Sequence, residues 1–375
     1  MNFDWTGEQL MLRESLERFG AEHYLPGARR GLLAEGAAGS RMRWKMMAEF
    51  GWLALALPDA CGGLGGTAVD VMALMEVFGR HLMLEPYVTS CVFAPALLAQ
   101  GTGGTVSRVL DGIATGDVQV SPALAEPGSG FDLSHVATSA ARAAGGFQLS
   151  GTKSYAENGA DADWFIVPAR TAGAVDEGSG ISLFLVPHDA PGLRRSGFRG
   201  IDYHRHARLE FDAVAVGSDA LLGPLDGGLP LLEAAVDRAI AAHLAEAVGS
   251  METLRDMTLA YLKSRRQFGV TIGSFQVLQH RMVDIAVACE EARSMTYHAT
   301  LRLAADAAGR RRAVSAAKVR VGQTSLFVGR ESVQLHGGVG TSDELIVSHH
   351  LKRLMMIDLA YGNADHHRML FADCA

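Results

Sequence analysis

Two short segments in the last third of the chain carry residue types that suit a phosphorylated ligand. The first reads RRQFG at residues 265–269, and Phe275 and Gln276 follow soon after. A guanidinium can pair with phosphate through two hydrogen bonds, and an aromatic ring beside it can cover an adenine. The same residues are equally compatible with an ordinary turn between helices whose arginines face the solvent. These residues by themselves leave both interpretations open.

The second segment reads QLHGGVG at residues 334–340. Its three glycines let the backbone approach a ligand closely and leave N–H groups available to an anion. No predicted strand precedes the segment, which disfavours a Rossmann dinucleotide fingerprint. Taken alone, such a glycine-rich turn is a weak signal and is more often a connector.

Two adjacent histidine pairs, at residues 349–350 and 366–367, raise a metal-site hypothesis. Neighbouring residues of a helix point about 100° apart, so neither pair makes a chelating face. We expect partly exposed helix histidines and no metal site. The four cysteines are scattered without a CxxC pair, which indicates reduced thiols rather than disulfides or structural zinc.

The composition is that of a well-packed protein, because 48% of the 375 residues are hydrophobic and 20% are charged. A net charge of -7 argues against general electrostatic binding to nucleic acid or acidic lipid. The first residues include acidic side chains and no apolar run, unlike a signal peptide. Apolar stretches fall short of the roughly 18–20 residues that span a bilayer. We expect a cytoplasmic protein without a membrane span.

The elements that must position these residues fall into three zones, of which the first is helical. Residues 6–100 have helical spacing, and Thr6 and Gln9 suit a capping box at its start. Residues 58–66 and 85–86 contain glycine or proline and predict turns between helices.

The second zone, residues 121–223, predicts a mostly antiparallel β unit, because short runs of β-forming residues alternate with glycine and proline. Asn158-Gly159 between two runs predicts a hairpin or turn. The runs are residues 146–149, 164–167, 181–186 and 207–211.

Helical periodicity returns in the third zone, from about residue 230 onward. Alanine-rich segments at residues 231–265, 275–308 and 312–335 predict long helices with a buried stripe. Residues 310–312, three arginines, read as a solvated basic turn.

Together these segments resemble a family, the acyl-CoA dehydrogenases. RRQFG, IGSFQVLQH and QLHGGVG, with a closing helix, resemble that family's C-terminal domain. ALAEPGSGFD and LSGTKSYAENGADADW are similar to its TEPxxGSD and GxKxWITNG segments, and FGWLALALPDACGGLGG and MEVFGR to its first helical domain. These segments follow one another in the same order as in the family, over nearly the whole chain. The motifs together therefore make a strong match, although each motif alone is a weak signal.

The resemblance implies an α+β fold in three parts. These are an N-terminal helical domain at residues 1–119, a middle β-barrel or sandwich domain at 120–224, and a C-terminal four-helix bundle at 225–375. It also implies a tetrameric flavoprotein whose FAD lies between the β domain and helices of two subunits. In this family a carboxylate removes the α-proton of an acyl-CoA thioester while flavin N5 accepts the β-hydride.

The resemblance also implies roles for individual residues toward FAD. Four would hold the adenosine diphosphate part: Arg265, Gln267, Phe268 and Gln276. Three would meet the same cofactor from a neighbouring subunit: Gln334, Gly337 and Gly338. Tyr155 could cover the flavin ring.

Both glutamates that the family uses as its base are absent. An alignment without gaps places Tyr361, of Tyr-Gly-Asn, on the glutamate of the family's Glu-Gly-Thr. A phenol has a pKa near 10 and is a poor base unless strongly perturbed. The alternative position, on an earlier helix, falls on Ala239. Asp237 would serve there only if the register slipped. Lys352-Arg353 replaces the family's Arg-Asp pair, whereas Glu344 matches a conserved glutamate.

Other parts of the expected site have also changed. Ala125 and Phe131 replace the threonine and serine of the TEPxxGSD stretch, and residues 155–157 (YAE) replace Trp-Ile-Thr. Asp358, three positions before Tyr361, could share its helical face and act as an unusual base. The alternative for Asp358 is a helix carboxylate in an interface ion pair.

This combination resembles the small subunits of heteromeric acyl-CoA dehydrogenases, such as that of pimeloyl-CoA dehydrogenase and partners in steroid side-chain oxidation. It implies an α2β2 assembly, active in fatty acid or steroid side-chain catabolism, whose larger subunit supplies the base. It also implies an acyl-CoA substrate and electron-transferring flavoprotein as electron acceptor. Two alternatives stay open: a homomeric dehydrogenase or oxidase (a tetramer or dimer) with a displaced carboxylate, and a non-enzymatic flavin- or CoA-binding scaffold.

Overall fold

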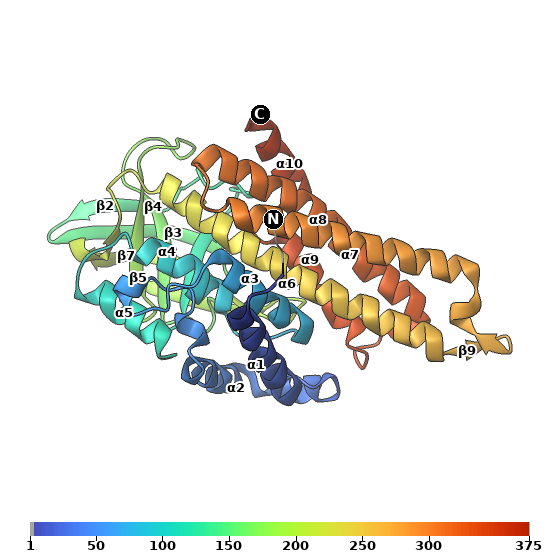
Figure 1. Ribbon diagram of the computed structural model, residues 1–375. Helices are drawn as coiled ribbons and strands as arrows, with labels where there is room; N and C mark the ends of the chain where they lie inside the picture. Colours follow the sequence, from blue (N-terminus) through green and yellow to red (C-terminus); the bar gives the residue numbers. More distant parts are fainter. Residues whose placement is uncertain (1–3, 375) are drawn as a thin grey trace. The chain divides into compact units, whose positions relative to one another are not determined.

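The computed structural model describes residues 4–374 of the chain, which form two compact units (Figure 1). The helical unit comprises the described residues of Met1–Gly36, Ala68–Met83 and Ile240–Ala375. The sheet unit comprises Ala37–Thr67 and Leu84–Ala239. The predicted α+β class, with helices before and after a β region, is confirmed. The predicted domain boundaries at residues 119–120 and 224–225 stay predictions.

The helical unit is built around three long helices that run beside one another in Figure 1. They are α6 (Leu229–Ser264, which begins in the sheet unit), α7 (Gln276–Arg302) and α8 (Ala307–His336). The other helices of this unit are α1 (Gly7–His23), α3 (Ala68–His81), α9 (Val347–Leu359) and α10 (Ala364–Asp373). The helix α2 (Arg29–Glu49) continues into the sheet unit after a break at Gly36.

Local sequence explains where these helices begin and how closely they pack. Thr6 accepts a hydrogen bond from the Gln9 amide, and the Gln9 side chain accepts one from the Thr6 amide, which confirms the predicted capping box. The helices α3 and α6 touch backbone to backbone, because a Cβ on Gly79 would lie 1.8 Å from the carbonyl oxygen of Glu246. Only glycine permits that crossing. Arg13 on α1 and Arg293 on α7 each bind Glu76 of α3, at 2.7 and 2.8 Å.

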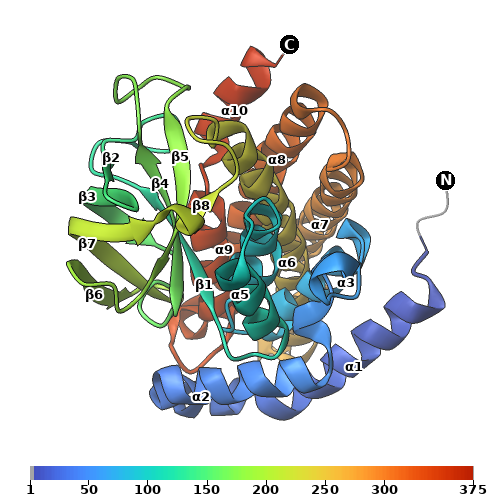
Figure 2. The same cartoon turned by 90° about the vertical axis from the view of Figure 1, so that its left-hand side faces the viewer.

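The sheet unit holds one curved sheet in the strand order β6-β7-β3-β1-β4-β5-β8 (Figure 2). The strand β2 pairs with both β3 and β4, which curls the sheet. Pairing is mostly antiparallel, as predicted, although β4 runs parallel to β1 and β2. The strands are β1 (Val120–Ala125), β2 (Ser139–Ala143), β3 (Gly146–Ala156), β4 (Trp164–Arg170), β5 (Ile181–Pro187), β6 (Leu193–Arg199), β7 (Arg205–Gly217) and β8 (Leu221–Leu222).

The core of the sheet unit consists of the inward side chains of these strands, including Phe147, Phe165, Phe184 and Leu209. All four predicted β runs lie within strands. Two short helices lie wholly within this unit, α4 (Ala94–Leu98) and α5 (Gly104–Ala114), and a π-helix at Val88–Phe93 precedes them.

Two local predictions need correction or refinement. Asn158-Gly159 forms a turn, with Asn158 at φ 55°, but not a hairpin, because β1 lies between β3 and β4 in the sheet. The predicted basic turn at residues 310–312 is wrong, since these arginines lie in the first turns of α8. The chain reverses earlier, before Asp306, whose side chain caps α8 by accepting from the Gly309 amide. Within residues 4–374, no helix is both long and apolar enough to cross a membrane.

Candidate functional site

The RRQFG segment forms a small hairpin at the end of α6. Its strands are β9 (Arg266–Gln267) and β10 (Val270–Thr271), and Phe268 and Gly269 at its tip have φ of 51° and 80°. The Phe268 side chain is 90% exposed and meets the Phe275 ring edge-on, at 6.2 Å between centres. Arg265, Gln267 and Gln276 are also exposed. The hairpin therefore presents cationic, amide and aromatic groups at the surface of the helical unit.

The glycine-rich turn is a short 3-10 helix, Gly337–Thr341, directly after α8. Gly337 has φ 66°, a conformation that favours glycine, and a Cβ on Gly337 or Gly338 would meet nothing within 4 Å. Gln334, Gly337 and Gly338 are exposed, as the phosphate-binding interpretation requires. Tyr261 of α6 stacks on His336 at 4.5 Å between ring centres, which brings the turn close to the hairpin of the same chain. An open glycine backbone beside exposed cations fits a dinucleotide phosphate.

Tyr155, the predicted flavin-covering residue, lies on β3 in an aromatic group of the sheet unit. Its ring centre is 4.6 Å from that of His206 and 6.2 Å from that of Phe198. The Tyr155 hydroxyl lies 3.4 Å from Nε2 of His206. The structure thus gives Tyr155 a supported, half-buried ring face, which suits stacking.

A buried ion pair supports the same strand. Lys153 of β3 donates to Glu126 Oε1 at 2.6 Å, and the backbone amides of Ala137 and Thr138 donate to Glu126 at 2.7–3.2 Å. Burial lowers the pKa of Lys153. Burial raises the pKa of Glu126, but Lys153 and the other donors outweigh this and hold that pKa below its ordinary value. The Glu126 carboxylate therefore accepts its hydrogen bonds from one lysine and from two backbone amides.

Tyr361, at the expected base position, lies in the turn between α9 and α10. Its φ is 58°, in the left-handed region that bulky residues rarely adopt. The buried Lys318 of α8 donates to the carbonyls of Ile357 and Ala360, and His367 Nε2–H donates to the Tyr361 carbonyl at 3.0 Å. These hydrogen bonds hold the strained turn in place. Ala239, at the alternative base position, is fully buried in α6.

The neighbours of Tyr361 include a buried cluster that was not predicted. Arg353 of α9 donates from Nε and Nη2 to Glu246 of α6, at 2.6 and 2.8 Å. His243 Nδ1 lies 3.1 Å from Oε2 of the same carboxylate, and the His243 and Tyr361 ring centres are 6.0 Å apart. Burial raises the pKa of Glu246, but Arg353 and His243 outweigh it and hold that pKa well below its ordinary value. The i, i+3 spacing of His243 and Glu246 is the only sequence signal for this cluster.

The two aspartates considered as substitute bases are placed differently from the expectation. Because α9 ends at Leu359, Asp358 and Tyr361 do not share a helical face. Asp358 faces α8 instead, where a Cβ on Gly322 would lie 2.3 Å from its Oδ1. Burial raises the pKa of Asp358, partly offset by Lys318. Asp237 is fully buried in α6.

The expectation of partly exposed histidines is wrong for three of the four. His349, His350 and His367 are buried, whereas His366 is half-buried. His350 Nδ1 contacts Ser250 Oγ at 2.8 Å, and His367 Nδ1 contacts Ser315 Oγ at 3.2 Å. Within residues 4–374, no group of three or more His, Cys, Asp or Glu side chains could hold a metal ion.

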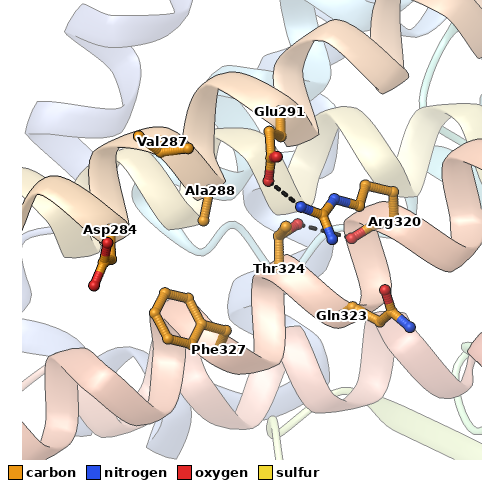
Figure 3. A pocket seen from close by; sticks show the side chains of 8 residues that line it. All are labelled: Asp284, Val287, Ala288, Glu291, Arg320, Gln323, Thr324 and Phe327. Carbon is orange, nitrogen blue, oxygen red and sulfur yellow. Dashed lines mark hydrogen bonds and ion pairs between the residues drawn. The ribbon is translucent and has the colours of Figure 1, made fainter. Parts of the chain in front are cut away.

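A cavity of about 380 Å³ lies between α7 and α8 (Figure 3), and none of the predicted site residues lines it. Glu291 and Arg320 form an ion pair across it, and the Thr324 hydroxyl donates to the Arg320 carbonyl at 2.9 Å. Val287 and Phe327 give it an apolar side. Its lining gives it no connection to the residues expected to bind FAD or to act as the base.

The chain is similar to known proteins along nearly its whole length. The chain is 28% identical to the probable acyl-CoA dehydrogenase YngJ of Bacillus subtilis over 381 residues, covering 99% of each chain. Among solved structures it is similar to the steroid ACAD Tcur3481-Tcur3483, with 27% identity, a TM-score of 0.87 and coverage of 98% and 97%. It shares the fold of PigA in an FAD complex, at 22% identity and a TM-score of 0.88, covering 100% of this chain and 98% of that one.

Family models match in the order that the motifs predicted. The N-terminal domain of acyl-CoA dehydrogenases matches residues 6–117, the middle domain matches 121–214, and the C-terminal domain matches 226–374. These matches leave only short stretches of the chain uncovered. The protein belongs to the acyl-CoA dehydrogenase family.

Proposed function

We propose that this chain is an FAD-binding subunit that takes part in α,β-dehydrogenation of an acyl-CoA thioester together with a larger acyl-CoA dehydrogenase subunit. One observation carries the proposal: the residues suited to FAD phosphates are retained, while Tyr361 and Ala239 stand where the family has its glutamate base. The larger subunit contributes the missing carboxylate.

FAD supplies the hydride acceptor for the β-carbon of the thioester. Arg265, Gln267 and Gln276 bind its diphosphate and adenosine, with Phe268 against the adenine. Gly337 and Gly338 offer backbone N–H groups to the phosphates of a cofactor held by a neighbouring subunit, and Tyr155 covers the flavin ring. The exposed guanidinium of Arg265 and the open left-handed backbone at Gly337 support this assignment.

The exposed apolar side chains of the hairpin region suit contact with a second subunit. Phe268 is 90% exposed and Val277, just beyond it, is 65% exposed. Burial of one such side chain against a second subunit stabilises the assembly by about 1.5–3 kcal/mol. The similar steroid ACAD Tcur3481-Tcur3483 is named for two proteins, which supports a heteromer of the α2β2 kind here. Electron-transferring flavoprotein would be the electron acceptor for FAD bound in the complex.

The test is co-expression of this chain with a larger acyl-CoA dehydrogenase encoded beside it, followed by native mass spectrometry and flavin absorbance. We expect equal numbers of the two subunits and stoichiometric FAD in the complex, and little FAD in the chain purified alone. A yellow homo-oligomer of this chain, bleached by acyl-CoA without any partner, would contradict the proposal and support a homomeric enzyme. A colourless chain with and without candidate partners would support a scaffold.

A further inference from the structure

Three aromatic side chains meet on neighbouring strands of the sheet unit: Tyr155 of β3, Phe198 of β6 and His206 of β7. The strand β7 lies between β6 and β3 (Figure 2). The His206 ring centre is 4.6 Å from that of Tyr155 and 5.7 Å from that of Phe198. His206 is only 1% exposed, whereas Phe198 is 44% exposed and Tyr155 is half-buried. His206 is therefore the covered member of the group, and the other two rings keep a surface that a ligand can reach.

Strand register explains why these side chains meet. Phe198 pairs with His206, and Ala156 pairs with Ala207. Both alanines belong to the core of the sheet unit, so their sequence neighbours Tyr155 and His206 point to the other face. Paired residues share a face, which places Phe198 there as well. The register of β3 against β7 shifts just before Ala156, and such bulges re-aim side chains beside functional sites.

The turn between β6 and β7 packs closely on the buried imidazole. The Gly200 amide donates to the His204 carbonyl at 2.9 Å and closes the turn. A Cβ on Gly200 would lie 3.0 Å from His206 Nε2 and 2.6 Å from Oδ1 of the buried Asp202. The imidazole is therefore enclosed by this turn as well as by Tyr155, and it has little room to change its rotamer.

His206 contacts Tyr155 in two ways. Its Nε2 lies 3.4 Å from the Tyr155 hydroxyl, at the long end of the range for a hydrogen bond. The two rings also face each other, with an angle of 34° between their planes. The hydroxyl can donate to Nε2 or accept from Nε2–H, and either bond fixes the direction in which the phenol points. A fixed phenol loses less conformational entropy when a planar ligand stacks on its free side.

We propose that His206 is the positioning residue of Tyr155 and thereby determines how firmly this chain holds the flavin ring. The imidazole does not touch the cofactor and exchanges no proton with it; it acts by fixing the Tyr155 hydroxyl and ring. The inference rests on the proposed function, in which Tyr155 covers the flavin, and goes beyond it by assigning a role to a second residue of the sheet unit. It leaves the supply of the base to the larger subunit.

The first test needs no cofactor and uses nitrogen NMR of the full chain labelled with 15N-histidine. The His206 signals are assigned by their loss in His206→Gln. We expect the Nε2 signal of His206 to shift in Tyr155→Phe, which keeps the ring and removes only the hydroxyl. The signals of the exposed His188, in the same unit, should not move and serve as the control. A His206 signal that is unchanged in Tyr155→Phe would overturn the inference.

The second test measures FAD dissociation and the absorbance spectrum of the flavin in the complex with the larger subunit. We expect Tyr155→Phe and His206→Leu each to weaken FAD binding about tenfold and to shift the flavin absorbance band. The double variant should be about as weak as either single one, because the two residues act as a unit. His206→Gln should recover most of the affinity, since its amide offers a donor and an acceptor. His188→Gln is the control and should bind FAD like wild type.

The outcomes separate positioning from simple packing and from the proposed function. Wild-type FAD affinity and flavin spectrum in His206→Leu overturn the inference. Losses that multiply in the double variant also overturn it, because Tyr155 and His206 would then act independently. Equal losses in His206→Leu and His206→Gln, together with lower unfolding temperatures, would show that His206 only supports the fold. If no complex forms, native mass and flavin absorbance report failure of the proposed function, and the NMR measurement on the chain alone then decides the contact.

Discussion

Glu126 of the sheet unit and Glu246 of the helical unit are both buried against a cation, and the two carboxylates differ in what else they contact. Glu126 binds Lys153 and the amides of Ala137 and Thr138. Glu246 binds Arg353 and also contacts an imidazole that neighbours Tyr361. The first network ends on backbone and fixes a strand, whereas the second leads to a half-buried phenol. A buried ion pair by itself therefore says little about function. The other groups that contact the carboxylate are more informative.

Removal of either cation is the largest expected perturbation. Lys153→Met and Arg353→Met each leave a buried carboxylate without its cation, which should lower the free energy of unfolding by about 3–5 kcal/mol. Chemical denaturation measures the loss. Glu126→Gln should partly rescue Lys153→Met. Lys352→Met, which removes the exposed pair with Asp343, is the matched control and should cost at most about 1 kcal/mol.

Acid sensitivity should follow from the buried histidines that lack a carboxylate. Burial lowers the pKa of His350 and of His367 to about 3 in each case. Between the unfolded pKa near 6.5 and pH 3 the unfolded chain binds these protons and the folded chain does not, so stability falls as the pH falls through this window. Each histidine contributes a slope of up to about 1.4 kcal/mol per pH unit.

Replacement of His367 by glutamine should flatten this dependence of the unfolding free energy below pH 6.5. His298→Gln, on the exposed face of α7, should leave the slope unchanged. An acid limb that is equally steep in His367→Gln and wild type would mean that His367 is protonated in the folded chain.

The hairpin offers a weaker perturbation, which acts on assembly rather than on folding. Phe268→Ser should leave the unfolding temperature of the chain alone nearly unchanged, because the side chain is 90% exposed. In the complex it should weaken association and FAD retention by about 1.5–3 kcal/mol, or roughly 10- to 100-fold in affinity. Phe50→Ser, at an exposed phenylalanine of the sheet unit, is the control. Equal effects of the two variants on FAD retention would argue against a cofactor role for the hairpin.

The smallest effect is expected at Asp358, which tests whether this chain uses a displaced carboxylate as its base. Its pKa is raised by burial, so the folded chain binds a proton more tightly than the unfolded chain and stability rises as the pH falls through that range. Asp358→Asn should stabilise the chain at neutral pH by about 1 kcal/mol and leave the bleaching of the flavin by acyl-CoA in the complex unchanged. Loss of bleaching in this variant would identify Asp358 as the base.

The sequence was sufficient to predict the order of helical and β regions, because that order depends on local patterns. The β runs, the long helices and the glycine turn at Gly337 follow from periodicity and composition. The Glu246–Arg353 pair joins residues 107 positions apart and exists only because α6 packs on α9. The burial of His350 likewise depends on Ser250 of α6, which no local pattern on α9 reveals. Chemistry assembled by packing between distant helices was therefore not predictable.

The central claim, that this chain depends on the carboxylate of a larger subunit, is tested most directly by bleaching of the flavin with acyl-CoA. The comparison is between this chain alone, the complex, and the complex in which the base carboxylate of the larger subunit is changed to glutamine. The account predicts bleaching in the unchanged complex and none in the other two samples. Bleaching of this chain alone, or undiminished bleaching in the complex that lacks the carboxylate of the larger subunit, would contradict the account.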